Sequence, residues 1–350
     1  MKSRCAMIPV SCYRTAAIAF VVLTFVSSPS VPAAATQVRC PQPPDPVRAI
    51  NLQGYYKDAA KSVVDRAAAA RKRAAVKPLK SYLNAVTRLA DRAITARPAL
   101  RHEGYGQCAI FWLRAWAEGG AYLGVMGSKQ AKAQRKWDLA GLALAYLKVR
   151  RYAGPVDRSV VDPWLQEIAD RARAVYNSPG KIRNNHWYWL GLGLGAVGLA
   201  TGSERHWNEA RTIMQDAAHD VRGDGFLPNE LKRGKRALHY HAFSLMPLVT
   251  LAELASAKGE DWYKLNSNSL HRLVQKTTLS LKNPVEIERI VGVSQERPLR
   301  TRAGWVQLYK SRFTDRRLPV DLPASKPYHR WLGGHVLALR RALSDLASSN

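Results

Sequence analysis

Residues 184–201 read NNHWYWLGLGLGAVGLAT, a polar start followed by a strongly apolar segment that contains Gly191, Gly193, Gly195 and Gly198. A helix that is apolar all round is buried by its neighbours. The glycines suit a position where helices pack closely and exclude water. We therefore expect this segment to be an inner helix of the fold.

The segments on both sides of this helix also show helical spacing of apolar side chains, over about 15–20 residues each. In chain order they are 57–75, 81–96, 107–125, 129–152, 163–176, 203–221, 238–257, 269–281 and 331–347. Ser203 is placed to cap the helix that follows it. No convincing series of alternating polar and apolar residues predicts strands. The sequence therefore predicts an all-α fold of helical hairpins, which can close into a toroid around a groove.

The N-terminus is typical of an exported protein. A basic start, an apolar run at 16–26 and three alanines ending at Ala35 predict a signal peptide over residues 1–35, too short to span a membrane. Residues 36–50 are rich in proline and predict an extended strap. We expect residues 51–350 to form a single helical domain in the periplasm, as a monomer without a membrane anchor.

The charge balance indicates a polyanionic partner. Lys and Arg number 54 against 26 Asp and Glu, giving a formal charge of +28. Such a balance favours nucleic acid, an anionic membrane face or an acidic polysaccharide, although a solvated basic surface is the simpler alternative. An exported chain rarely meets nucleic acid, and no motif of the usual nucleic-acid modules is present. An acidic glycan is therefore the expected partner.

The cysteines agree with export. Cys5 and Cys12 leave with the signal peptide, while Cys40 and Cys108 remain as a pair in an oxidising compartment. We expect these two to form a disulfide that ties the strap to the body of the protein. No Cys-x-x-Cys is present, so a zinc site built on thiolates is not expected.

Residues 182–245 concentrate the groups that could carry chemistry. Asn185 and His186 supply an amide and an imidazole, Arg233 a guanidinium and Tyr240 a phenol. A helix spanning the last two would place them on one face, but Gly234 lies between them and allows the helix to begin later.

These groups suit β-elimination in a uronic-acid polymer. A base must remove the C5 proton beside a charged carboxylate while an acid protonates the leaving oxygen on C4. Amide, imidazole and guanidinium donors can neutralise that carboxylate, and a tyrosine or histidine can move the protons. No metal or organic cofactor is required. The same residues also have purely structural interpretations. Asn-Asn-His is typical of a helix cap, and residues 232–236 are typical of a run of charged side chains exposed to solvent.

Three sequence motifs in this region match the pattern of a known enzyme family. They are NNHWYW at 184–189, GFLPNELKR at 225–233 and RALHYH at 236–241. In this spacing they resemble the mannuronate-specific alginate lyases, polysaccharide lyase family five. Weaker similarity extends upstream through Cys108-Ala109 and Arg135-Lys136-Trp137.

The resemblance implies an incomplete (α/α) toroid with a deep groove. It implies β-elimination on poly-β-D-mannuronate that leaves a 4-deoxy-hex-4-enuronosyl end. Asn185 and Arg233 would neutralise the substrate carboxylate, and His186 would assist them or act as base. Tyr240 would protonate the leaving oxygen, and it can also serve as base because the C5 proton and C4 oxygen of mannuronate lie on the same side. The sequence leaves the choice between His186 and Tyr240 open.

The resemblance also implies a lid near the start of the mature chain. Tyr56 and Lys57 are the candidates for it, although an ordinary helix start would look similar. The remaining motif residues that we expect to bind substrate are Asn184, Trp189, Arg236 and His241.

Two positions depart from the family pattern. Trp187 stands where serine is usual, and His239 stands where alanine is usual; Trp305-Val306-Gln307-Leu308-Tyr309 only loosely matches the family's C-terminal segment. Trp187 is placed to narrow the groove or to stack on a sugar. These departures keep open a lyase acting on another polyuronate, such as polyglucuronate. The basic charge alone also allows a non-catalytic protein that binds an anionic exopolysaccharide.

Overall fold

In the computed structural model, which describes residues 38–176, 183–298, 304–314 and 326–348, the apolar segment forms helix α6 (Asn185–Thr201). Its side chains are buried along almost the whole length. A Cβ on Gly198 would lie 2.7 Å from the backbone nitrogen of Trp207 in helix α7 (Glu204–Asp220). Glycine therefore allows the two helices to pack closely, and the prediction of an inner helix is confirmed.

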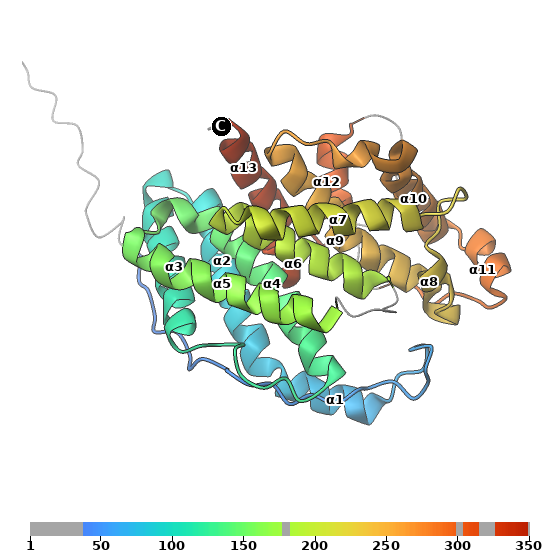
Figure 1. Ribbon diagram of the computed structural model, residues 1–350, viewed down its shortest axis with the longest axis horizontal. Coiled ribbons are helices and arrows are strands. Elements are labelled where there is room, and N and C mark those ends of the chain that lie inside the picture. Colours follow the sequence, from blue (N-terminus) through green and yellow to red (C-terminus); the bar gives the residue numbers. More distant parts are fainter. Residues whose placement is uncertain (1–37, 177–182, 299–303, 315–325, 349–350) are drawn as a thin grey trace, which may run out of the picture. The chain divides into compact units, whose positions relative to one another are not determined.

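The other long helices form hairpins around α6 (Figure 1). The inner helices contact one another in the order α2 (Lys77–Thr95), α4 (Lys129–Val149), α6 and α9 (Ala237–Ala257). The outer helices pack against them: α3 (His102–Glu118) on α2 and α4, α5 (Pro155–Tyr176) on α4 and α6, α7 on α6 and α9, and α10 (Leu265–Lys282) on α9. Helix α13 (Val336–Ala347) contacts α2, α4 and α9. The predicted all-α arrangement of hairpins is confirmed.

Short elements connect the hairpins. They are α1 (Arg66–Ala75), α8 (Pro228–Leu231), α11 (Val285–Val291), α12 (Trp305–Arg312) and the 3-10 turns Ala99–Arg101, Arg150–Tyr152, Gly234–Arg236, Trp262–Lys264 and Arg330–Leu332. Strands β1 (Tyr328–His329) and β2 (Gly334–His335) pair antiparallel, with Tyr328 opposite His335. Strands of two residues are too short to show an alternation of polar and apolar side chains, so the sequence did not predict them.

The helix predicted over residues 57–75 is wrong in its first half, because α1 begins only at Arg66. The Asp58 carboxylate accepts hydrogen bonds from the backbone nitrogens of Ser62 and Val63, which closes a loop. Lys61 in that loop has φ +60°, a conformation that cannot continue a helix. The loop brings Tyr56 and Lys61 to one cavity, although they are five residues apart.

The described part of the proline-rich segment, residues 38–49, forms neither helix nor strand. Cys40 and Cys108 form the predicted disulfide, with an S–S distance of 1.99 Å. The Trp112 indole adds a hydrogen bond to the Pro41 carbonyl oxygen at 2.9 Å, so the strap is fastened along α3. The predicted signal peptide lies outside the described residues. Among the helices that the structure describes, none combines the length and apolar character that a membrane span needs.

Candidate active site

A cavity of about 460 Å³ opens where the ends of several inner helices meet the loop before α1. Its lining residues are Gly54, Tyr55, Tyr56, Lys61, Lys72, Lys129, Gln130, Trp137, Asn184, Asn185, His186, Arg233, Arg236, His239, Tyr240, Phe243 and Trp331. The four residues predicted to be catalytic are all among them. Five of the lining residues in this described part of the chain are Lys or Arg and none is Asp or Glu, so the cavity favours an anionic ligand.

One wall of the cavity is held by a buried carboxylate. Glu230 is fully buried, and its Oε1 accepts hydrogen bonds from the backbone nitrogen and the Nδ2 of Asn185 at 2.6 and 2.9 Å. Its Oε2 accepts one from Nε of Arg233 at 3.3 Å. Burial raises the pKa of Glu230, against the lowering effect of Arg233 and Asn185. The carboxylate thus fixes the amide and the guanidinium side by side.

The chain reverses between Arg233 and Tyr240, so the two residues do not share a helical face. Helix α9 begins only at Ala237, after the 3-10 turn in which Gly234 has φ +54°. The reversal lays the Arg233 guanidinium over the Tyr240 ring, 4.7 Å from its centroid. Arg236 lies 5.3 Å from the same centroid. Two cations therefore flank the phenol.

The Tyr240 hydroxyl meets a second tyrosine across the cavity. Its oxygen lies 3.2 Å from the hydroxyl oxygen of Tyr56, which also accepts a hydrogen bond from Arg236 at 2.6 Å. Burial raises the pKa of Tyr56, but hydrogen bonds with Tyr240 and Tyr55 and the nearby Arg236 outweigh it and lower the pKa overall. Burial and then the Tyr56 charge raise the pKa of Tyr240. One hydroxyl of the pair therefore ionises more easily while its partner keeps its proton.

His186 stands at the start of α6, where the Asn184 side chain caps the helix by accepting a hydrogen bond from the His186 backbone nitrogen at 2.9 Å. Its Nδ1 lies 2.9 Å from Nζ of the buried Lys136. Burial, then Lys136, Arg233 and Lys61, lowers the pKa of His186 well below its ordinary value. The imidazole is therefore neutral near pH 7.

The structure places three of the other predicted residues at the cavity: Tyr56, Asn184 and Arg236. Lys57 is exposed and outside it, because the turn at Asp58 directs Lys61 there instead. The prediction for Lys57 is therefore corrected to Lys61.

Trp189 and His241 do not reach the cavity. Trp189 is completely buried and packs against Phe243. His241 is also buried, where its Nε2 accepts a hydrogen bond from the Leu227 backbone nitrogen and its Nδ1 donates one to the Ala237 carbonyl oxygen. Neither residue lines the cavity, so their predicted role in substrate contact is not retained.

The two departures from the family pattern have different outcomes. The Trp187 indole donates a hydrogen bond to Asp216 on α7 at 3.1 Å, and Trp187 does not line the cavity. The prediction that it narrows the groove is therefore wrong. His239 lines the cavity and lies 3.1 Å from Arg236 Nη2.

Sequence reasoning missed Glu230, Lys136 and the cavity residues Lys72 and Lys129. Glu230 stands three residues before Arg233, a spacing that brings side chains together within one turn, and this was a usable signal. For Lys136 the only signal was its place in the weakly similar segment Arg135-Lys136-Trp137, since a lysine normally faces solvent.

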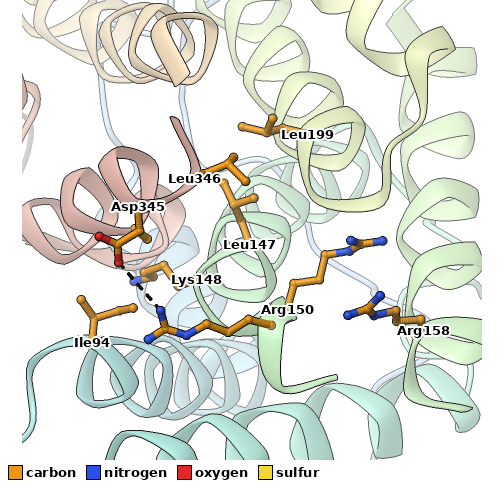
Figure 2. A pocket seen from close by; sticks show the side chains of 10 residues that line it. Ile94, Leu147, Lys148, Arg150, Arg158, Leu199, Asp345 and Leu346 are labelled. Carbon is orange, nitrogen blue, oxygen red and sulfur yellow. Dashed lines mark ion pairs between the residues drawn. The ribbon is translucent and has the colours of Figure 1, made fainter. Parts of the chain in front are cut away.

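A second pocket lies at the opposite end of α4, lined by Ile94, Leu147, Lys148, Arg150, Arg151, Arg158, Leu199, Ala342, Asp345 and Leu346. Figure 2 shows this pocket with Asp345 and a dashed line for its ion pair. The partner of Asp345 is Arg151, at 3.8 Å. This pocket is also cationic. Among its described lining residues there is no tyrosine or histidine that could transfer a proton, and no side-chain amide that could bind a carboxylate. The first cavity has all three, so it is the candidate active site.

Comparison with known proteins adds independent findings. A family model described as alginate lyase matches residues 38–287. A polysaccharide lyase of Stenotrophomonas maltophilia (strain K279a) is 39% identical over 302 residues, which cover 85% of this chain and 89% of that protein. An alginate lyase of Azotobacter vinelandii is 33% identical over 255 residues, covering 70% of this chain and 67% of that one.

Solved structures match the fold. Alginate lyase A1-III from Sphingomonas species A1 matches with a TM-score of 0.72 and 21% identity, over 87% of this chain and 88% of that one. A variant of alginate lyase A1-III complexed with a tetrasaccharide matches with a TM-score of 0.73 and 21% identity, over 89% and 88%. At this identity the match concerns the fold, which is an α/α toroid.

Proposed function

The chain belongs to the alginate lyase family, and from this premise we propose that it cleaves poly-β-D-mannuronate by β-elimination. The break at the 4-O-glycosidic bond would leave a 4-deoxy-hex-4-enuronosyl end. The observation that carries the proposal is one cavity without acidic residues among its described lining, in which Tyr240 is flanked by two guanidinium groups and shares the lining with the Asn185 amide and the His186 imidazole.

Each side chain has a role in this reaction. Asn185, His186 and Arg233 would donate hydrogen bonds to the C5 carboxylate and so stabilise the negative charge that spreads onto it when the C5 proton leaves. Donors fixed in advance, as Glu230 fixes Asn185 and Arg233, are worth far more than mobile ones because no reorganisation is needed. The sugar carboxylate would fit beside the start of α6, whose dipole also favours an anion.

Tyr240 would transfer the protons. In the free site Tyr56 is the hydroxyl that ionises more easily, so Tyr240 acts as base only after its proton passes to the Tyr56 oxygen; it is then a phenolate flanked by Arg233 and Arg236 and can take the C5 proton. The same oxygen, now protonated, can then donate to the leaving C4 oxygen. Both transfers from one group require the proton and the leaving oxygen to lie on one side of the sugar, as they do in mannuronate.

A second polyuronate is an alternative substrate, and His239 favours it. This imidazole stands at the cavity where the family usually has alanine, and it contacts Arg236. A larger polar side chain changes which sugar substituents fit next to Tyr240. Polyglucuronate is the alternative that we consider. We also propose that the protein acts in the periplasm, from the N-terminal pattern of a signal peptide.

The Tyr240→Phe variant tests the proposal. We expect its kcat on polymannuronate to fall by about 10²–10⁴-fold, the usual contribution of a positioned acid or base, while binding of a mannuronate oligomer measured by calorimetry is retained. The control is Tyr152→Phe, which removes a hydroxyl that accepts a hydrogen bond from Arg151 outside the cavity and should leave kcat unchanged. Normal turnover by Tyr240→Phe would refute the role of Tyr240. If the wild-type protein binds the oligomer but does not cleave it, the protein is a non-catalytic polysaccharide-binding protein and the proposed lyase activity is refuted.

A further inference from the structure

Lys136 is a completely buried lysine, and both of its hydrogen bonds among the described residues go to His186. Its Nζ lies 2.9 Å from Nδ1 of His186 and 2.9 Å from the carbonyl oxygen of the same residue. The centroid of the Tyr176 ring lies 4.2 Å from Nζ and that of Trp137 5.6 Å. Within the described part of the chain no carboxylate forms an ion pair with it.

Burying a lysine in this way is costly. Desolvation alone lowers the pKa of Lys136 well below its ordinary value. A side chain that only filled space would be replaced by Leu or Met at no such cost. The position of Nζ therefore indicates a function exerted on His186.

We propose that Lys136 is a positioning residue that fixes the tautomer of His186, so that His186 presents an N–H to the substrate carboxylate and does not act as the base. The proposal rests on the proposed function, because it assigns the role of His186 in that same reaction. It also decides between His186 and Tyr240 in favour of Tyr240.

The donors of Lys136 Nζ and the acceptors around it fix the tautomer of His186. The His186 carbonyl oxygen can only accept, so Nζ must donate one hydrogen bond to it. We assign a second Nζ–H to Nδ1, 2.9 Å away, which then accepts and carries no proton; an ammonium allows only this direction, whereas a neutral amine could also accept from a protonated Nδ1. A neutral imidazole holds one proton, so Nε2 carries it. The neutral amine still has two N–H groups, one for each acceptor, and the ammonium has a third for the face of Tyr176.

The consequence concerns the chemistry at Nε2. With Nδ1 occupied by Lys136, Nε2 is the ring nitrogen left to the cavity that His186 lines. A protonated Nε2 can donate to a carboxylate oxygen but has no lone pair to take the C5 proton. The rings of Trp137 and Tyr176, with centroids 5.6 and 6.0 Å from that of His186, hold the imidazole in its plane.

The tautomer can be measured directly by ¹⁵N NMR of histidine-labelled wild-type protein near pH 7, with the His186→Gln variant used to assign the His186 signals. We expect a protonated Nε2 and an unprotonated Nδ1. A protonated Nδ1, which would require the lysine amine to accept from it, would overturn the proposal. This measurement needs no activity, so it stands or fails separately from the proposed reaction.

The Lys136→Met variant supplies the kinetic test. Met keeps the unbranched chain and removes the donors, so the imidazole should lose its single tautomer and kcat should fall by about 10²-fold, the usual effect of a misplaced catalytic group. KM should change much less. Lys136→Gln keeps an N–H donor and should recover part of the loss. A folded Lys136→Met with wild-type kcat would overturn the proposal, and if that variant does not fold the tautomer of the wild type still decides.

Discussion

Replacing Arg233 by alanine separates the chemical role of this residue from its structural one. Arg233 is 15% exposed and is the cation paired with Glu230, which is 0% exposed. Arg233→Ala removes a fixed donor to the developing charge, which should lower kcat by about 10²–10³-fold. It also leaves a buried carboxylate without its cation, a change that costs about 3–5 kcal/mol of stability. Because Asn185 still donates two hydrogen bonds to Glu230, we expect the lower end of that range.

The double variant Arg233→Ala/Glu230→Gln distinguishes the two effects. The glutamine side chain introduced there is uncharged, and its amide oxygen can accept both hydrogen bonds from Asn185. The double variant should therefore recover most of the stability, measured by guanidinium unfolding, while its kcat stays as low as that of the single variant. Recovery of kcat together with stability would refute the reasoning, because it would make the role of Arg233 purely structural. Arg151→Ala is the control, since its exposed ion pair with Asp345 contributes little.

Three further results are expected. The pKa of His241 is about 4 in the folded protein, against 6.5 for the unfolded chain. Its contribution to the free energy of unfolding is therefore complete above pH 6.5, and about 3 kcal/mol of it is lost as the pH falls to 4. A His241→Gln variant should lose this part of the dependence of stability on pH. Reduction of the disulfide, which closes a loop of 68 residues, should lower the free energy of unfolding by about 4 kcal/mol, and an unchanged unfolding curve would contradict this. Turnover of a polyanion should fall as salt rises beyond about 0.1 M, where charges more than about 10 Å apart are screened, and salt-independent rates would place the excess charge away from the cavity.

Composition and periodicity were sufficient to predict the helical framework. Residues 184–201 are apolar on every face, so only an inner position could accommodate them, and the structure puts α6 there. The strap and its disulfide followed from proline content and a single remaining pair of cysteines. These properties depend on the segment itself and not on the rest of the fold.

The site was harder to predict because it depends on how the chain turns. Gly234 reverses the chain, so Arg233 meets Tyr240 across a turn and not along a helix. Helical geometry alone shows that His239 and His241, about 200° apart around α9, do not both face one cavity, but it does not say which of them does. Lys61, and not Lys57, lines the cavity because the Asp58 carboxylate closes a loop between them. Such a loop leaves no periodic pattern in the sequence.

The buried charges were the other source of error. Glu230 and Lys136 each hold a catalytic candidate by two contacts, yet in the sequence both look like solvated residues. Their burial becomes apparent only when the ends of α4, α6 and α9 are brought together around one cavity. Positioning residues of this kind are defined by tertiary contacts, whereas the groups that would touch substrate could be proposed from their chemistry.

The most direct test of the reaction is the ultraviolet absorbance of the purified mature protein mixed separately with polymannuronate, polyguluronate, polyglucuronate and hyaluronate. Elimination creates a conjugated double bond at the new chain end, which hydrolysis does not. We predict a rise in absorbance with polymannuronate. A rise only with another polymer would keep the mechanism and change the substrate, and no rise with any of the four would contradict the proposed lyase activity.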